Sequence, residues 1–483
     1  METPLETPLT VSISFILYTI GIVLVGLYSA KFASRSTADY LLARKGLGPW
    51  VTALSASASS ESGWVTLGLV GTAFTEGLAT FWVVPGCLLG YAFNWWVMAR
   101  PISRHAAAHE IYTIPDLMGS LFRDKAHAVR LVSVAVIFLM MTAYVAAQFN
   151  AAGKAFEAVF HIQYEFGVLI GVGIVLFYTI TGGFRAVAWT DFVQGLLMWL
   201  ALVFLPILTV SHAGGWSNVL ASLAEQDTNL VSWSAGKTGF LMFGLVFGWL
   251  GIGLGYPGQP HVLIRFMAAR DAATIKKGRI IAMAWGTFVF TGAVVLGLAS
   301  RTLFGTLGDA EQALPIIALK ILPGVLAGLM LAAVLAAICS TADSQLLVAS
   351  SSLSHDLYAR LTGKDLDSRF VVNMDRVAVC AVGILAMLLA LTENRMIFTF
   401  VLYAWAGLGA AFGPPLILGL LWKKTTSTGA IAGAVVGFAT ILIWKNIPPL
   451  SDAIYELVPG FFLGFFTVWI VSLIEHGKNE GRG

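Results

Sequence analysis

The chain has 483 residues, of which 58% are hydrophobic and only 11% are charged, and its mean hydropathy is +0.82. Soluble domains carry roughly 25% charged residues, so this chain lacks the polar surface needed to cover a water-soluble fold. The composition predicts an integral membrane protein with no separate soluble domain, and the net charge of +3 gives no reason to expect a nucleic-acid partner.

Long apolar runs recur along the chain, and a bilayer-spanning helix needs about 20 such residues. We count thirteen, at residues 10–30, 48–77, 80–99, 128–158, 165–181, 188–211, 237–266, 279–303, 314–352, 371–391, 396–422, 427–446 and 456–475. Alternate connections between these runs hold 23 of the 29 basic residues, with Arg265 counted among them. By the positive-inside rule, this predicts an odd number of spans, an N-terminus outside and a C-terminus in the cytoplasm.

Two of the thirteen runs are predicted to be broken helices. The second contains "SASASSESGW" (55–64), with five serines and a glutamate, and the seventh contains "GIGLGYPGQP" (251–260). Proline removes a backbone donor and clashes with the preceding turn, so the seventh run cannot form a regular helix. An unwound backbone is tolerated at membrane depth only where it is buried in protein or lines a cavity.

The two breaks lie five spans apart, which is the pattern of an inverted-repeat transporter. We therefore predict one transmembrane domain over 1–483, with one five-helix repeat at 48–211 and a second at 237–422. Residues 10–30 would be an extra N-terminal helix, and residues 427–475 would form two C-terminal helices.

The ninth run contains a third polar cluster, "AICSTADSQ" (337–345). Sodium is a hard cation that takes oxygen ligands. The hydroxyls of this cluster, together with backbone carbonyls freed near Ala58 and Glu61, could supply them without a full charge. The alternative is that serines and threonines in membrane helices merely bond to their own helix or join neighbouring helices.

Ionisable residues at membrane depth are costly and point to function. Glu61, Asp191 and Asp343 are the candidates, although the two aspartates could instead be helix caps or salt-bridge partners near the interface. Aromatic and amide side chains near the breaks could line a solute pocket, although packing and interfacial belts explain most membrane aromatics. The chain has no Walker-type Gly-Lys-Ser/Thr and no His/Cys cluster, so we expect neither ATP drive, nor an organic cofactor, nor an enzyme.

Several motifs occur in order along the chain: "LGPWVTALSASASSESGW", "GGFRAVAWTDFVQ", "GLGYPGQPHVLIRFMAA", "STADSQLLVASS" and "ENR" followed by "YAWAGLGAAFGP". Over about residues 15–465 this pattern resembles the sodium/solute symporter family, and within it the bacterial sodium/proline symporters. The resemblance implies an all-α fold of about thirteen helices with a leucine-transporter-like 5+5 inverted-repeat core. It also implies sodium-driven import of a small solute, most closely proline, by alternating access in a bacterial inner membrane. We expect the solute and membrane lipid as partners, and a functional monomer.

Carried over position by position, the resemblance implies a sodium site formed by the backbone carbonyls of Ala58, Glu61 and Ala337 and the hydroxyls of Ser340 and Thr341. It relates Asp191 to a family aspartate implicated in sodium coupling, and Asp343 and Ser344 join it as coupling candidates. The implied solute contacts are Ser62, Gly63, Tyr144, Tyr256 and Pro260. Four further candidates for the solute pocket lie beside them or near the breaks: Ser60, Gln148, Trp249 and Gln259.

Three departures from the proline symporters weaken the assignment of proline. Those carriers have an aspartate followed by methionine where this chain has Ser60-Glu61, so the acid has moved by one residue, about 100° around a helix. They have tryptophan where this chain has Ile252, and glycine where it has Gln148. A sodium symporter for another amino acid, a carboxylate or a sugar acid therefore remains the alternative.

Overall fold

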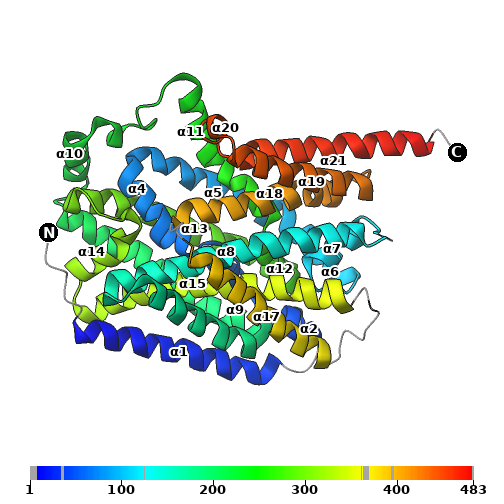
Figure 1. The fold of residues 1–483 in the computed structure, drawn as a ribbon, viewed down its shortest axis with the longest axis horizontal. Coiled ribbons are helices and arrows are strands. Elements are labelled where there is room, and N and C mark those ends of the chain that lie inside the picture. The colour runs from blue at the N-terminus through cyan, green and yellow to red at the C-terminus, as the bar shows by residue number, and fades with distance from the viewer. Residues whose placement is uncertain are drawn as a thin grey trace.

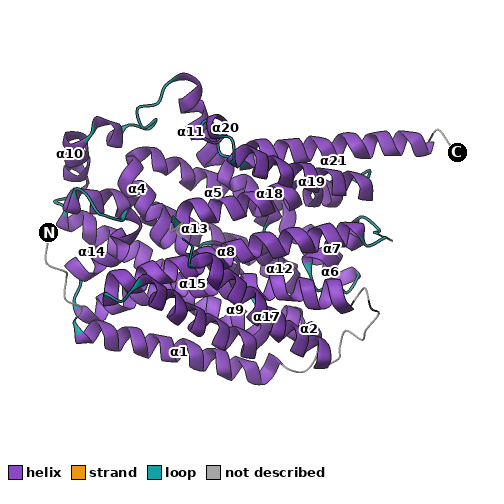
Figure 2. Ribbon diagram, viewed as in Figure 1, coloured by secondary structure: helices purple, strands orange, loops and turns teal. Residues whose placement is uncertain are grey.

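The computed structural model describes residues 8–33, 37–124, 126–359, 362, 369–392 and 396–480. Within these residues the chain is helical and has no strand, apart from one isolated backbone bridge between Leu47 and Ala269 (Figure 2). The α-helices are α1 (Leu9–Ala33), α2 (Thr37–Leu42), α3 (Pro49–Ser60), α4 (Val70–Glu76), α5 (Val83–Ala92), α6 (Ala99–Ala108), α7 (Ile114–Leu121), α8 (Ala128–Phe160), α9 (Tyr164–His212), α10 (Trp216–Gln226), α11 (Gly239–Gly251), α12 (Pro260–Ala268), α13 (Ala272–Phe304), α14 (Ala313–Ile321), α15 (Gly324–Ser351), α17 (Arg369–Ala390), α18 (Ile397–Leu421), α19 (Ser427–Lys445), α20 (Pro448–Ser451) and α21 (Leu457–Glu480).

Tighter or wider helical turns interrupt several of these helices. The principal ones are π-helical at Trp64–Leu69, Phe93–Met98 and Ser352–Ala359, and 3₁₀-helical at Gly77–Trp82 and Ile252–Gly258. Such turns often mark functional sites. Two of them adjoin the two breaks predicted from the sequence.

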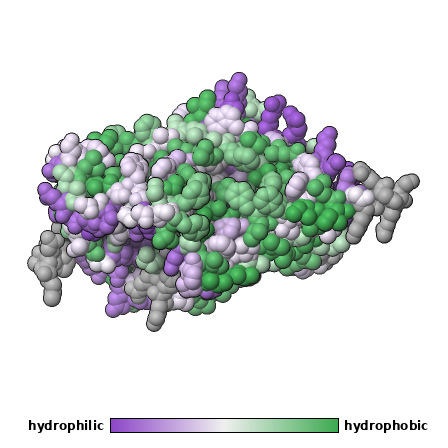
Figure 3. All heavy atoms as spheres, turned by 90° about the horizontal axis from the view of Figure 1, so that it is seen from above, coloured by the Kyte–Doolittle hydropathy of each residue, from purple (hydrophilic) through white to green (hydrophobic). Residues whose placement is uncertain are grey.

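The long helices run side by side along the longest axis of the molecule (Figure 1). The short helices α10 and α14 lie at one end, which we call the α10 end, and α2, α6 and α7 lie at the opposite α6 end. Helix α1 begins at the α10 end and α21 finishes at the α6 end. In Figure 3, hydrophobic side chains cover much of the middle of the molecule, and many hydrophilic ones lie toward its ends, as expected of a membrane protein.

Ten helical stretches in the described part of the chain are long and apolar enough to cross a membrane, and two shorter apolar helices cover Leu9–Val25 and Tyr164–Phe177. The predicted count of thirteen spans is not confirmed and stays a prediction. One reason is physical: the second predicted run is interrupted after Ser60, so its first helix has only 12 residues.

Two of the predicted run boundaries differ from the structure. The run predicted at 314–352 contains two helices, α14 and α15, because the chain turns at Leu322 and Pro323. The runs predicted at 165–181 and 188–211 are joined in α9, which is kinked at Gly183. Gly183 has φ 57°, a left-handed conformation that other residues rarely adopt.

Helix α15 is the most enclosed of the candidate spans. In its most apolar window 83% of the residues are buried, compared with 33% for α17, α19 and α21. Its polar side chains therefore lie inside the protein and not against lipid. Helix α15 packs against α8, α9 and α1, and also meets α3, which carries the first break.

Candidate functional site

The first break lies between α3 and the π-helical turn that follows it. Glu61 leaves the helical conformation with φ −102° and ψ 78°, and the helix resumes after Gly63. The backbone N–H of Trp64 donates to Ser62 Oγ at 3.2 Å, and its indole N–H donates to the Ser60 carbonyl at 3.0 Å. Side chains therefore replace the missing helical hydrogen bonds, which is how serine competes with regular helix.

A cluster of four oxygens lies where α3 meets α15. The Ser340 hydroxyl lies 2.9 Å from the Ala58 carbonyl and 3.2 Å from the Ala337 carbonyl, and the Thr341 hydroxyl lies 3.4 Å from the Ala58 carbonyl. All four residues are fully buried. We call this set the oxygen cluster. Two carbonyls and two hydroxyls, none formally charged, are oxygen ligands of the kind a hard cation takes.

The second break runs through Ile252–Gly258 to Gln259, which is extended with φ −90° and ψ 103°. Its carbonyls are held by neighbouring helices: the Asn94 amide donates to the Tyr256 carbonyl at 2.9 Å, and the Trp405 indole N–H donates to the Ile252 carbonyl at 3.0 Å. Glycine is required here for close approach, because a Cβ on Gly253 would collide with the carbonyl of Gly86. The two broken segments are thus fixed in protein and not exposed to lipid.

Two predicted solute contacts support this second break. The Gln259 amide nitrogen lies 3.1 Å from the carbonyls of both Gly255 and Trp405. Pro260 is the first residue of α12, where its missing N–H costs nothing. Both residues therefore stabilise the backbone of the second break, and a role of either in solute binding stays a prediction.

The Glu61 carboxylate, also fully buried, joins the two breaks. Its Oε1 accepts hydrogen bonds from Ser60 Oγ at 2.9 Å, from Tyr91 at 3.1 Å and from Tyr256 at 2.8 Å. Tyr91 and Tyr256 also meet edge to face, with ring centroids 5.0 Å apart. Sequence reasoning missed Tyr91, because an isolated tyrosine in the third apolar run carries no signal. Hydroxyl donors let a buried carboxylate keep acceptor interactions that it would otherwise lose on leaving water.

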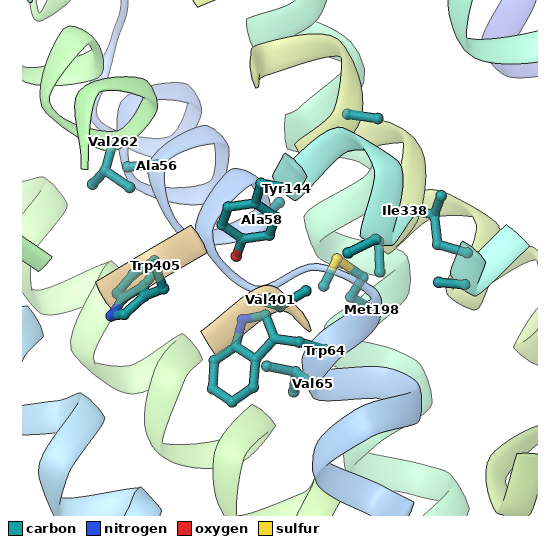
Figure 4. Close-up of a cluster of buried hydrophobic side chains, with 14 of the residues drawn as sticks. Ala56, Ala58, Trp64, Val65, Tyr144, Met198, Val262, Ile338, Val401 and Trp405 are labelled. Carbon is teal, nitrogen blue, oxygen red and sulfur yellow. The ribbon is translucent and has the colours of Figure 1, made fainter. Parts of the chain in front are cut away.

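Gln148 and Tyr144, from α8, flank the same unwound segment. Gln148 Oε1 accepts the N–H of Gly63 at 3.1 Å. Tyr144 is fully buried, with its ring edge-on to His261 at a centroid distance of 6.0 Å. Figure 4 shows Tyr144 with Trp64 and Trp405 around the end of α3. The structure therefore brings these two residues to the first break, as the sequence led us to expect.

A buried ion pair lies beside the oxygen cluster. Arg265 Nη2 contacts Asp191 Oδ2 at 2.9 Å, and both side chains are fully buried. The guanidinium also donates to Ser55 Oγ at 3.0 Å, to Ser344 Oγ at 2.5 Å and to the His261 carbonyl at 2.5 Å. Each charged nitrogen thus has a partner, which a buried guanidinium needs in order to be stable.

The expectation that Arg265 lies in a connecting loop is wrong. Arg265 belongs to α12 and is buried because the Asp191 carboxylate neutralises it. Asp191 therefore has a salt-bridge partner, one of the alternatives left open for it, and its role in sodium coupling stays a prediction. The Ser344 hydroxyl donates to the Ser340 carbonyl at 2.7 Å and lies 3.2 Å from Asp343 Oδ1, so one helical turn separates the ion pair from the oxygen cluster.

A cavity of about 620 Å³, which we call the vestibule, opens between α4, α11, α18 and α20 and reaches inward to Trp249, Ile252 and Phe398. Phe398 lies between two tryptophans, with centroids 5.7 Å from Trp249 and 6.1 Å from Trp64. Trp249 therefore lines the vestibule, and Tyr256 lies deeper, at Glu61. The rings of Trp249, Phe398 and Trp64 thus form a row from the vestibule lining to the first break.

A second ion pair, missed by the sequence analysis, holds the vestibule wall. The Glu311 carboxylate pairs with Lys154, and it accepts the backbone N–H groups of Ile397 and Phe398 at 3.1 and 2.9 Å. Lys154 also pairs with Asp309 at 2.9 Å. Lys154 lies in a predicted membrane run, so the rule that flagged Glu61 could have found it. Glu393, Asn394 and Arg395, the "ENR" motif, lie outside the described residues.

Comparison with known proteins shows which family the whole chain resembles. Residues 40–437 match the profile of the Sodium:solute symporter family. The chain is 40% identical to the high-affinity proline transporter PutP of Bacillus subtilis over 462 residues, covering 95% of this chain and 96% of that protein. It is 36% identical to the sodium/proline symporter of Escherichia coli, covering 97% and 94% of the two chains.

Among solved structures, the fold is similar to a Na⁺-coupled sialic acid symporter in a substrate-bound, outward-open state. The TM-score is 0.81 at 18% identity, covering 97% of this chain and 98% of the other. At that identity the likeness concerns the fold alone. The likeness confirms the predicted fold class, an all-helical fold with a leucine-transporter-like core, in which this chain has two broken helices.

Proposed function

The chain belongs to the sodium:solute symporter family, and we propose that it couples inward sodium movement to the uptake of proline or a closely related small amino acid. It is a transporter and not an enzyme. One observation carries the proposal: the two broken helices meet in a buried polar centre beneath the vestibule. The relatives that match nearly the whole chain at 36–40% identity are named as proline transporters, which supports the choice of solute.

Sodium is proposed to bind at the oxygen cluster. The cation would take the place of the hydrogen bonds between the Ser340 and Thr341 hydroxyls and the Ala58 carbonyl. The Glu61 carbonyl is the further ligand that the family resemblance implies. The neighbouring Asp191–Arg265 pair is proposed to link the occupancy of this site to α9 and α12, with Asp343 and Ser344 as connecting residues.

The vestibule is proposed as the outer route to this centre. The residues that line it include five acidic side chains, Glu76, Asp309, Glu311, Asp452 and Glu456, and two basic ones, Lys237 and Lys445. A predominantly acidic cavity raises the local concentration of cations. Trp64, Trp249 and Phe398 form the barrier that has to move for a solute to reach the first break.

The remaining expectations from the sequence enter as parts of the same proposal. Residues 48–211 and 237–422 are the two repeats, the α6 end faces the cytoplasm of a bacterial inner membrane, and a single chain suffices for transport. The orientation can be tested with two variants, Lys237→Cys and Lys276→Cys, in intact cells treated with a membrane-impermeant maleimide. We expect the maleimide to label the cysteine at position 237 and not the one at position 276.

A competition experiment decides between proline and another solute. Purified protein in liposomes with an inward sodium gradient should accumulate labelled proline, and a hundredfold excess of unlabelled proline should reduce the uptake to background. An excess of a sugar acid should leave the uptake unchanged. If the protein does not take up proline but takes up another amino acid, a carboxylate or a sugar acid, the alternative solute is favoured. The departures at Glu61, Ile252 and Gln148 are the reason for considering that alternative.

Glu61→Gln is expected to lower the initial rate of sodium-driven uptake by roughly tenfold. The amide keeps the acceptor that Ser60, Tyr91 and Tyr256 share, but it loses the charge and adds two buried N–H donors, and each unsatisfied donor costs about 1–3 kcal/mol. The measurement is uptake at several external pH values, with Ser60→Ala as the control that removes only one donor. If Glu61→Gln retains the wild-type rate at every pH, the carboxylate has no part in transport. If it merely abolishes a pH dependence, Glu61 carries a proton.

A further inference from the structure

The α6 end contains a large cavity outside the two breaks, the oxygen cluster and the vestibule. Its volume is about 1050 Å³, and it is walled by four segments that are distant in the sequence: α6, the end of α7 with the loop after it, the end of α18 with the loop to α19, and His476 of α21. The first three segments contribute arginine and lysine side chains, namely Arg100 and Arg104, then Arg123, then Lys423 and Lys424. We call it the basic cavity.

The charge of the basic cavity is unbalanced. Five arginine and lysine side chains line it, with His105, His109 and His476 beside them, and the lining that the structure describes contains no aspartate or glutamate. These five formal charges exceed the net charge of +3 of the whole chain. The vestibule at the opposite end has an acidic majority, so the asymmetry is not general to the cavities of this protein.

The positive-inside rule alone does not explain this arrangement. That rule places basic residues on one side of the membrane, but it does not gather them around one hollow or exclude acids from it. A neighbouring cavity at the same end, of about 250 Å³, shares Arg100 and Arg104 with the basic cavity and is also lined by Asp271, which pairs with Arg270 at 3.3 Å. Arg123 has φ 50°, a left-handed conformation that a non-glycine residue adopts uncommonly.

The other polar groups of the basic cavity suit an anion. The hydroxyls of Ser120, Thr425 and Thr426 line it, each with a partner within the protein, and α19 begins directly after Thr426, whose Oγ1 caps it by accepting the Gly429 N–H at 3.1 Å. The N-terminus of a helix carries partial positive charge and favours anions. Arginine forks and lysine ammonium groups are the usual partners of phosphate.

We propose that the basic cavity binds an anion with at least two phosphate groups. Two sources share this chemistry: the headgroup of a diphosphate lipid and a free diphosphate. Exposed apolar side chains lie beside the cavity on α18 and α21, with Leu421 52%, Leu473 39% and Ile474 55% exposed. Acyl chains could lie along them, so the lipid source is the better fit. Binding would join α6 to the α18–α19 loop, and it does not depend on which solute is carried.

The test uses the full-length protein in detergent, with cardiolipin, phosphatidylcholine and inorganic pyrophosphate as probes in a microscale binding assay. Cardiolipin is expected to bind, and phosphatidylcholine is not. Lys423→Gln/Lys424→Gln should weaken cardiolipin binding roughly tenfold or more, since each basic residue near an anionic lipid contributes strongly. The matched control is Lys276→Gln/Lys277→Gln, an exposed lysine pair outside the cavity lining, which should change it less than twofold.

Each outcome has a defined meaning. Displacement of cardiolipin by millimolar pyrophosphate, or binding of pyrophosphate alone with the same dependence on Lys423 and Lys424, supports the site and identifies a free diphosphate as a source. The proposal is overturned if both lysine-pair variants weaken cardiolipin binding equally, or if neither cardiolipin nor pyrophosphate binds. Arg104→Gln/Arg123→Gln serves as a second variant if the first does not elute as a folded monodisperse protein.

Discussion

Replacing Asp191 with alanine is expected to lower the free energy of unfolding by about 3–5 kcal/mol, the cost of leaving a buried charge without its partner. Arg265 is fully buried, and its other contacts, to Ser55, Ser344 and a backbone carbonyl, are all neutral acceptors. They cannot compensate a full positive charge. The measurement is thermal or denaturant unfolding of the purified protein at constant sodium concentration.

The matched control removes both charges together. Asp191→Leu/Arg265→Met should recover most of the lost stability, because a buried ion pair is often replaceable by apolar groups of similar volume. If the pair also serves coupling, this stable double variant will still bind solute but will lose its stimulation by sodium. A double variant as unstable as Asp191→Ala, or an Asp191→Ala protein as stable as wild type, contradicts the account of the pair given above.

Ser340→Ala is expected to raise the sodium concentration needed for half-maximal uptake by roughly tenfold. Its hydroxyl is closest to the Ala58 carbonyl, and losing one oxygen partner worth about 1–1.5 kcal/mol changes an affinity by about that factor. Thr341→Ala should have a smaller effect, because its hydroxyl lies 3.4 Å from the same carbonyl. The measurement is initial uptake rate against sodium concentration at fixed solute.

Two variants control for damage to α15. Thr341→Ser keeps the hydroxyl and should keep the wild-type sodium dependence. Ser351→Ala removes a buried hydroxyl that bonds to its own helix, at the Val348 carbonyl, and it should also leave the sodium dependence unchanged. If Ser340→Ala and Thr341→Ala both transport with unaltered sodium dependence, the oxygen cluster is not the sodium site.

The breaks were predictable because their causes are local. The prolines at 257 and 260 forbid a regular helix, and the serines from 55 to 62 can bond to nearby backbone. The structure has both breaks where the sequence indicated, at Glu61 and at Gln259. The boundaries of the spans were harder to predict from the sequence. An apolar run does not reveal a turn inside it, as at Pro323, and it does not show that two runs belong to one kinked helix, as at Gly183.

The pairing of charges was not predictable. Arg265 lies 74 residues from Asp191, and Lys154 lies 157 residues from Glu311. The sequence flagged Asp191 as costly at membrane depth, but it counted Arg265 as a loop residue, since basic residues near span ends usually are. Only helix packing decides whether such a residue reaches water or a buried carboxylate.

By itself, the sequence determined the membrane class, the helical fold, the two breaks and the polar positions on the second, seventh and ninth runs. These follow from composition, proline chemistry and the cost of polar groups in lipid, which are properties of single residues and their neighbours. The tertiary structure alone decided that the Glu61 carboxylate meets Tyr91 and Tyr256, and it gave the distance between Ser340 and Ala58, which the family resemblance had already grouped in one site. Those distances depend on how α3, α5 and α15 pack, and packing is a property of surfaces that the linear order of residues does not display.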